Sequence, residues 1–155
     1  MQLPYIVVLL VVFFVSMVGK FFSNAGMDWY DTLNKPALTP PRWVFGVVWP
    51  LIFLLTALAA ITVWQRFTRD SIFWTIILLF VVNAVLNLSW SYLFFYKHLI
   101  FASVICSVLL TLVTYALIFL IAQQSFAVAS LLFLYAGWIT FATYLDFLFW
   151  VLNRR

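Results

Sequence analysis

The sequence contains little charge. Only 8% of its 155 residues are charged, glutamate is absent, and 68% of the residues are hydrophobic. Soluble domains carry about a quarter charged residues, because charge is needed to cover a surface in water. Glycine and proline are also scarce, and Cys106 is the one cysteine. These shortages exclude a soluble globule, a disordered chain, a collagen and a disulfide scaffold, and they indicate an integral membrane protein.

Residues that carry enzyme chemistry are scarce as well. The eight basic residues occur singly or in pairs, without the run that follows a phosphate backbone, so nucleic acid is not expected as a partner. His98 is the one histidine, and no group of Cys, His and Asp has the spacing of metal ligands, so no metal site is predicted. A serine nucleophile would lack a nearby base. Hydrolytic and metal-dependent enzymes are therefore not expected, and no cofactor is required.

Five apolar stretches are each long enough to cross about 30 Å of hydrocarbon, which takes roughly 20 helical residues. Backbone groups in lipid need internal hydrogen-bond partners, so these stretches are predicted to be helices. They cover residues 3–22, 43–64, 72–95, 99–122 and 127–152. A cleaved signal peptide is the alternative for the first stretch, but that stretch lacks a basic start and is longer than a typical signal. The sequence thus predicts an all-α integral membrane protein, a five-helix transmembrane bundle that forms a single domain over residues 1–155.

The basic residues are distributed unequally between the two ends of this bundle. One end holds the first and third connections and the C-terminus, and the other end holds Arg66 and Arg69. The bases of the first end are Lys20, Lys35, Arg42, Lys97, Arg154 and Arg155. Because cytoplasmic connections are enriched in Lys and Arg, the sequence predicts a cytoplasmic C-terminus and an N-terminus outside. It does not identify the membrane.

The first connection, SNAGMDWYDTLNKPALTPPR over residues 23–42, is longer than a link between two helices requires. Unstructured loops of this length usually either function or are disordered. Trp29 and Tyr30 are apolar enough to pack on a bundle, and three prolines restrict the unfolded loop. Asp28 is expected to cap a short helix that begins at Trp29. We therefore predict a long structured loop that forms a lid, the alternative being an interfacial aromatic belt.

Three groups of residues share a pattern with a known family. The first is Trp29, Tyr30, Leu33, Lys35, Pro36, Pro40, Pro41, Phe45 and Trp49. The second is Asn83, Asn87, Trp90, Ser91, Phe94 and Phe95, and the third is Tyr135, Trp138, Phe141, Ala142, Thr143 and Leu145. Together with the five spans and the long first loop, they resemble the tryptophan-rich sensory protein family (TspO), which includes the mitochondrial translocator protein. Two residues depart from the family pattern: Leu134 replaces its usual Pro, and Asp146 replaces its usual Asn.

The resemblance implies a membrane sensor or translocator that binds tetrapyrroles such as protoporphyrin and haem, and in some members sterols or benzodiazepine-type ligands. The implied partners are the lipid bilayer, a porphyrin or another flat apolar molecule, and a second copy of the chain, since dimers are common in the family. Some members degrade porphyrin in light, so a photochemical enzyme using Trp49 and Trp138 is an alternative, and an unrelated small transporter is another. The implied ligand-binding residues are Trp29, Tyr30, Pro41, Phe45, Trp49, Asn83, Asn87, Trp90, Ser91, Phe94, Tyr135, Trp138, Ala142 and Asp146.

The positions of these residues can also be interpreted without the family. Asn83, Asn87 and Ser91 recur at i, i+4 and i+8, so they share one helix face. Polar groups at mid-span normally face protein or a cavity. These three side chains are therefore expected either to form hydrogen bonds between helices, each of which contributes about 0.6 kcal/mol on average, or to contact a ligand.

The last span has a comparable face, because Tyr135, Trp138, Ala142 and Asp146 follow the same spacing. The small Ala142 leaves space that a larger side chain would fill. Asp146 is expected either to reach the interface or a base such as Arg154, or to contact a ligand or the lid. We predict a pocket between the second, third and fifth spans, under the lid.

Overall fold

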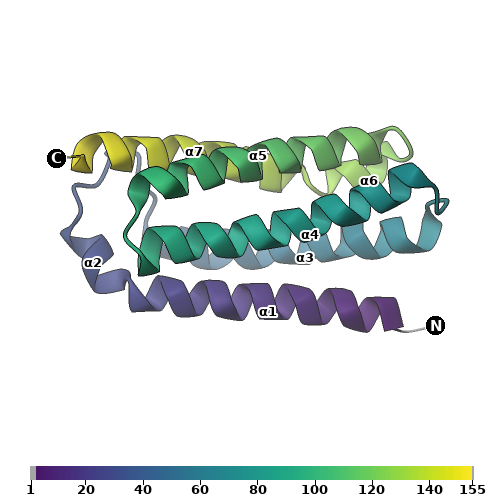
Figure 1. Ribbon diagram of the computed structural model, residues 1–155, viewed down its shortest axis with the longest axis horizontal. Helices are drawn as coiled ribbons and strands as arrows, with labels where there is room; N and C mark the ends of the chain where they lie inside the picture. The colour runs from purple at the N-terminus through teal and green to yellow at the C-terminus, as the bar shows by residue number, and fades with distance from the viewer. Residues whose placement is uncertain (1–2, 155) are drawn as a thin grey trace.

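The computed structural model describes residues 3–154 and consists of long helices that run roughly side by side (Figure 1). Five helices are long and apolar enough to cross a membrane: Tyr5–Ala25, Arg42–Arg66, Ser71–Tyr96, Ile100–Ala122 and Phe133–Asn153. The prediction of an all-α bundle with five spanning helices is confirmed, and the chain is an integral multi-pass membrane protein. Arg155, one of the bases counted above, lies outside the described residues.

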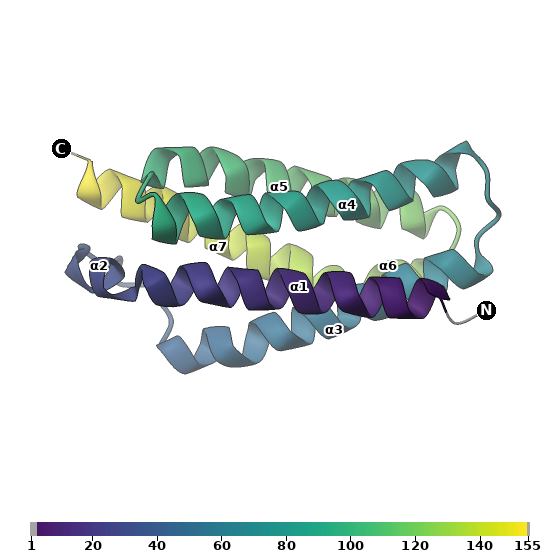
Figure 2. The same cartoon turned by 60° about the horizontal axis from the view of Figure 1, so that its bottom comes forward.

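In chain order the helical elements are α1 (Leu3–Ala25), α2 (Met27–Thr32), α3 (Arg42–Arg66), α4 (Ser71–Ser91), the π-helical turn η1 (Tyr92–Tyr96), α5 (Ile100–Ala122), α6 (Phe126–Ser130) and α7 (Phe133–Asn153). α1 packs against both α3 and α4, and α5 packs between α4 and α7 (Figure 2). The N-terminus and the C-terminus lie at opposite ends of the bundle (Figure 1).

We call the end that holds α2 and the C-terminus the lid end, and the end that holds the α3–α4 connection the far end. Which end faces the cytoplasm stays a prediction from the basic residues.

The buried core is divided along the bundle. At the far end the core is mainly aliphatic and well covered, with Val63, Leu117, Ile121 and the aromatic Phe73 each at most 1% exposed. At the lid end it consists of Phe94, Leu145 and Phe149, against which the aromatic residues of the first connection pack. The bundle is therefore closed by aliphatic packing at the far end and by aromatic packing at the lid end.

The last predicted span, 127–152, is not one helix. The chain turns between α6 and α7, where Leu131 N donates to Val128 O at 3.2 Å and Leu132 N donates to Ala129 O at 3.0 Å. These short-range bonds replace the regular helical ladder, and they allow Ala129 and Leu132 to be buried in the far-end core. The turn contains no glycine or proline, so the sequence offered no signal of it.

The first connection is folded, as predicted, but its helix starts earlier than expected. α2 begins at Met27 with Gly26 before it, and no side chain caps it, so the prediction that Asp28 caps a helix starting at Trp29 is wrong. A Cβ on Gly26 would lie 2.1 Å from the backbone oxygen of Phe95. This close approach to η1, rather than a capping side chain, determines where α2 starts. Asp28 instead lies in the first turn, where its negative charge interacts favourably with the positive end of the helix dipole.

Candidate functional site

The first connection is attached to the bundle by polar contacts at both of its sides. Asn34 N donates to Asn153 Oδ1 at 2.9 Å, and Asn153 Nδ2 donates back to Asn34 O at 3.0 Å. Asp31 accepts hydrogen bonds from Lys35 and from Arg42, the first residue of α3. Together these contacts connect α2 and the following loop to the start of α3 and the end of α7. The segment from α2 to Arg42 is the lid.

The inner surface of the lid is aromatic. Tyr30 lies between 5.5 and 6.3 Å, centroid to centroid, from Phe94, Phe95 and Phe149. Trp29 stacks on His98 at 4.1 Å with an interplanar angle of 11°. Burial raises the pKa of the Tyr30 phenol. Trp29 and Tyr30 therefore contact protein, which favours the predicted lid over an aromatic belt at the headgroups.

The ion pairs of the lid should be insensitive to pH over most of the range. Hydrogen bonds from Arg42 and Lys35 lower the pKa of Asp31 from 3.8 to about 2. Because the folded pKa is depressed, this attachment is fully present above about pH 4 and is lost as the pH falls toward 2. Hydrogen exchange of the lid amides should stay constant from pH 8 to 5, after correction for intrinsic rates, and rise at pH 3. Asp31→Asn should exchange faster at every pH, and an Asp31→Asn lid as protected as wild type would contradict this assignment.

Below the lid, two pairs of partly buried aromatic residues come from three helices, and Trp49 of one pair and Trp138 of the other pack against the same core residues. Phe45 and Trp49 come from α3, Trp90 from α4 and Trp138 from α7. Trp49 lies 6.4 Å from Trp90 with an interplanar angle of 30°, and Phe45 contacts Trp138 edge-on at 5.5 Å. We call these four residues the aromatic cluster. Ala142 packs against the same buried core residues as Trp49 and Trp138 do.

One hydrogen-bond donor in this cluster is left without a partner. Trp138 Nε1 is buried and forms no hydrogen bond with the part of the chain that the structure describes. A buried donor without an acceptor costs about 1–3 kcal/mol. Trp138 Nε1 is therefore a candidate contact for an acceptor on a ligand.

Asp146 does not reach the interface or a base, contrary to the first of the two alternatives above. It is 4% exposed, and its Oδ2 accepts a hydrogen bond from Trp90 Nε1 at 2.5 Å. In residues 3–154 it forms no ion pair. Asp146 thus holds the indole of Trp90 in place within the aromatic cluster. Whether it also contacts a ligand stays a prediction.

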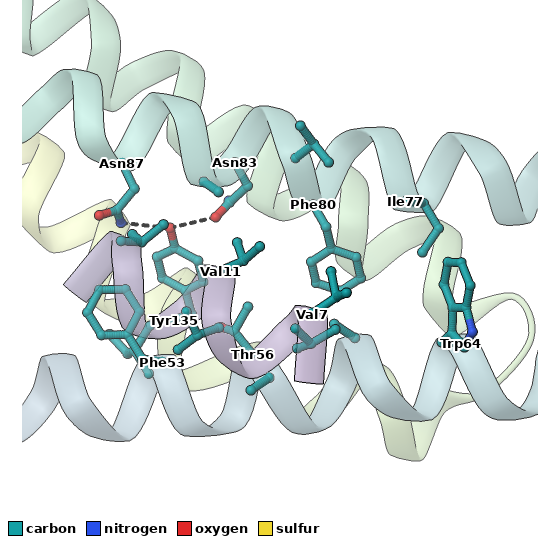
Figure 3. Close-up of a pocket in the computed structure, with 18 residues that line it drawn as sticks. Val7, Val11, Phe53, Thr56, Trp64, Ile77, Phe80, Asn83, Asn87 and Tyr135 are labelled. Carbon is teal, nitrogen blue, oxygen red and sulfur yellow. Dashed lines mark hydrogen bonds between the residues drawn. The ribbon is translucent and has the colours of Figure 1, made fainter. Parts of the chain in front are cut away.

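A layer of amide and hydroxyl groups lies next to the aromatic cluster. Tyr135 OH donates to Asn83 Oδ1 at 3.0 Å and accepts from Asn87 Nδ2 at 3.3 Å (Figure 3). Asn83 Nδ2 donates to Thr114 Oγ1 on α5 at 3.1 Å. We call these four residues the amide layer, which connects α4, α5 and α7 across the bundle interior. Ser91 bonds the Asn87 carbonyl of its own helix at 3.3 Å. The two asparagines of the predicted polar face thus bond between helices, whereas Ser91 bonds within its own helix. Thr114 was not foreseen because threonine is unremarkable in an apolar helix.

A cavity of about 360 Å³ opens on the other side of the amide layer, between α1, α3 and α4 (Figure 3). Of the predicted site residues, only Asn83, Asn87 and Tyr135 line it. Its other walls are almost entirely aliphatic or aromatic. Large aromatic side chains line the region under the lid, whereas valines and alanines line this cavity. The cavity therefore lies beside α1, in a different place from the predicted pocket.

The remaining predicted residues lie near the lid. Pro41 directly precedes the first turn of α3. Phe94 is 2% exposed and lies under Trp29 and Tyr30. The structure thus brings the predicted residues together in three adjoining groups, which are the lid, the aromatic cluster with Asp146 and Ala142, and the amide layer. Ligand contact by any of them stays a prediction.

Comparison with known proteins places the chain in a family. The model of the TspO/MBR family matches residues 6–151. The tryptophan-rich protein TspO of Bacillus cereus is 31% identical over 150 residues, covering 93% of this chain and 95% of that protein. The protein of the same name from Archaeoglobus fulgidus is 34% identical over 94% of each chain. The human translocator protein is 28% identical over 85% of this chain and 79% of its own. The chain therefore belongs to the TspO/MBR family.

Proposed function

We propose that this member of the TspO/MBR family is a membrane sensor or translocator that binds a tetrapyrrole under the lid. The names of its relatives, which include tryptophan-rich protein TspO and translocator protein, support the general class. The observation that carries the finer proposal is the aromatic cluster. Its four residues come from three helices, and none is fully buried. Aromatic faces that are not fully covered suit a flat, largely apolar ligand that stacks on them.

The charges near the cluster also suit a porphyrin, which carries carboxylates at one edge. Arg42, Phe45 and Trp49 follow one another at i, i+3 and i+7 of α3, so they share one face. Arg42 is about 10 Å along the axis from Trp49, by the helical rise of 1.5 Å per residue. With Lys35 and Asp31 it forms a group of net charge +1 at the rim. A macrocycle on the cluster would place its carboxylates toward this basic rim.

Trp138 provides the sharpest test of this site. Its free indole N–H is proposed to donate a hydrogen bond to an acceptor at the edge of the porphyrin ring. Losing a hydrogen bond of about 1 kcal/mol lowers an affinity about fivefold, so Trp138→Phe should weaken binding by that factor. The measurement is quenching of tryptophan fluorescence as protoporphyrin is titrated into protein in nanodiscs. Trp74, on α4 and 54% exposed, lies outside the cluster, so Trp74→Phe is the matched control. If wild type binds saturably and both variants bind with the same affinity, Trp138 does not contact the ligand. An absence of saturable binding by wild type would contradict the proposed function.

Light-dependent degradation of the bound porphyrin is the second candidate function. The observation that favours it is the near-parallel pair Trp49 and Trp90 at 6.4 Å, since an indole at the site wall is an oxidisable group beside the ligand. In this second candidate function the chain would be an enzyme whose reacting group is an indole, and the proposed step uses no metal ion or nucleophile of the protein.

A further inference from the structure

We propose that the cavity between α1, α3 and α4 binds one acyl chain of an anionic bilayer phospholipid. The headgroup is held outside it, by Arg66 and Arg69 at the far end. This site is separate from the aromatic cluster under the lid and does not depend on the proposed function.

The chemistry of the lining fits a hydrocarbon chain. The α1 wall is a stripe of valines, of which Val7, Val11 and Val15 recur every four residues, and no charged residue lines the cavity. The polar groups at its inner end, Asn83, Asn87 and Tyr135, already bond one another and require nothing from a ligand. A charged ligand would be left without a counter-charge in this space, which is costly.

The length of the cavity fits one leaflet of a bilayer. Its lining on α3 extends from Ile52 to Trp64, about 18 Å at a rise of 1.5 Å per residue. Half of a hydrocarbon core that is about 30 Å thick is about 15 Å. An acyl chain that follows α3 from the far end would therefore reach the amide layer near the middle of the membrane.

The cavity opens sideways, toward lipid. Val7, Val11 and Val81 line it and are nevertheless 50%, 46% and 56% exposed. α1 and α4 diverge toward the N-terminus of α1 in both views (Figures 1 and 2). Between α1 and α3, Gln65 Nε2 donates to Tyr5 OH and connects these two helices. The mouth therefore lies between α1 and α4, where a chain can enter from the bilayer.

Two arginines lie near the outer end of the cavity. Trp64 lines that end, and the Arg69 guanidinium lies 5.0 Å from the centre of its ring. Arg66 is the last residue of α3. Within residues 3–154, neither arginine forms an ion pair, and the nearby Asp70 carboxylate accepts from Phe73 N at the start of α4. Two bases without an acidic partner attract an anionic headgroup in whichever leaflet they face, because unlike charges attract, and this selects an anionic phospholipid over a neutral apolar molecule.

The test uses the full chain in phosphatidylcholine nanodiscs that contain a small fraction of phosphatidylglycerol with a photoreactive diazirine in its acyl chain. After illumination, adducts are mapped by mass spectrometry. We expect adducts on residues that line the cavity, such as Phe53 and Phe80, and the loss of these adducts in Ala60→Phe, which fills the cavity. Ala116→Phe, on α5 and outside the lining, is the matched control and should retain them. If Ala60→Phe does not fold, Val81→Phe at the exposed mouth replaces it.

The headgroup is tested separately, by comparing probes with phosphatidylglycerol and phosphatidylcholine headgroups. Cavity labelling by the phosphatidylglycerol probe should fall about fivefold in Arg69→Gln, while Lys97→Gln at the lid end leaves it unchanged. Equal labelling by both probes, unaffected by Arg66→Gln and Arg69→Gln, would overturn the anionic headgroup. Adducts confined to outward-facing residues such as Leu54 and Leu112, unaffected by Ala60→Phe, would show surrounding bilayer lipid only and overturn the site. Neither readout uses porphyrin, so failure here is distinct from failure of the proposed function.

Discussion

Replacing Ala142 with phenylalanine is expected to lower the affinity for protoporphyrin at least about tenfold, the equivalent of 1.4 kcal/mol. Ala142 packs against the same buried core as Trp49 and Trp138, and it is only partly buried. A phenyl ring added there would occupy the space between α3 and α7 that the ligand is proposed to use. If the region were instead a closed core, the same substitution would overpack it and cost about 1–3 kcal/mol of stability. The affinity is measured by tryptophan quenching, and the stability by thermal unfolding followed by circular dichroism.

Two other alanines make this result interpretable. Ala116→Phe on α5 adds the same volume away from the lid, the aromatic cluster and the cavity, and it should bind like wild type. Ala60→Phe fills the cavity beside α1 and should also leave the affinity for porphyrin unchanged, because the proposed porphyrin site lies on the other side of the amide layer. If a folded Ala142→Phe protein kept wild-type affinity and Ala60→Phe lost binding, the porphyrin site would be the cavity beside α1 and not the region under the lid.

The five spans could be predicted from the sequence because each span depends only on its own local composition. A stretch of roughly 20 apolar residues must become a helix in lipid, whatever its neighbours are. The turn at Leu131 and Leu132 could not be predicted in this way. It exists because Ala129 and Leu132 both reach the far-end core, and this burial is a property of the packed bundle. The start of α2 depends likewise on the backbone of Phe95, which lies far along the chain from Gly26.

The same distinction applies to the site. The spacing of Asn83 and Asn87 was sufficient to predict a polar face on the third span, and the structure shows that this face bonds Tyr135 and Thr114 on other helices. The cavity was missed because its α1 wall consists of valines. In a sequence, a valine that lines a cavity looks the same as a valine that faces lipid, and only the angle between α1 and α4 distinguishes them.

Asp146 shows how a departure from the family pattern is accommodated. An unpaired carboxylate within a span is costly unless it is hydrogen-bonded or neutral. Here the Trp90 indole donates to it at 2.5 Å. An asparagine, the residue usual in the family, would offer an amide oxygen in the same place. The hydrogen bond to Trp90 therefore accounts for how either residue is tolerated at this position, and it fixes one face of the aromatic cluster.

If the protein degrades porphyrin in light, Trp49→Phe or Trp138→Phe should slow the reaction far more than it weakens binding. A photoexcited porphyrin that stacks on the aromatic cluster can take one electron from an indole, which leaves an indole radical cation and a porphyrin radical anion. Dissolved dioxygen is the proposed oxidant: it adds to the macrocycle and supplies the oxygen of the product, and the electron returns to the indole. A phenylalanine in the same place keeps an aromatic surface that is much harder to oxidise. Trp49 contacts Trp90, Phe53 and Tyr135, so the substitution retains packing partners and separates oxidation from binding. The measurement is the rate at which the porphyrin absorption band disappears under light at saturating protein.

The rate in each variant is expected to approach that of free porphyrin under the same illumination, while the dark samples stay constant. Trp74→Phe removes an exposed indole outside the cluster, so it controls for the number of tryptophans and should react at the wild-type rate. A uniform decrease in all three variants would mean that indoles act as general quenchers rather than as members of a site. Equal rates in wild type, every variant and free porphyrin would exclude the enzyme and leave a protein that binds porphyrin. A rate that falls only with Trp49 or Trp138 would assign the electron donor to the aromatic cluster, to which α3 and α7 contribute these two residues.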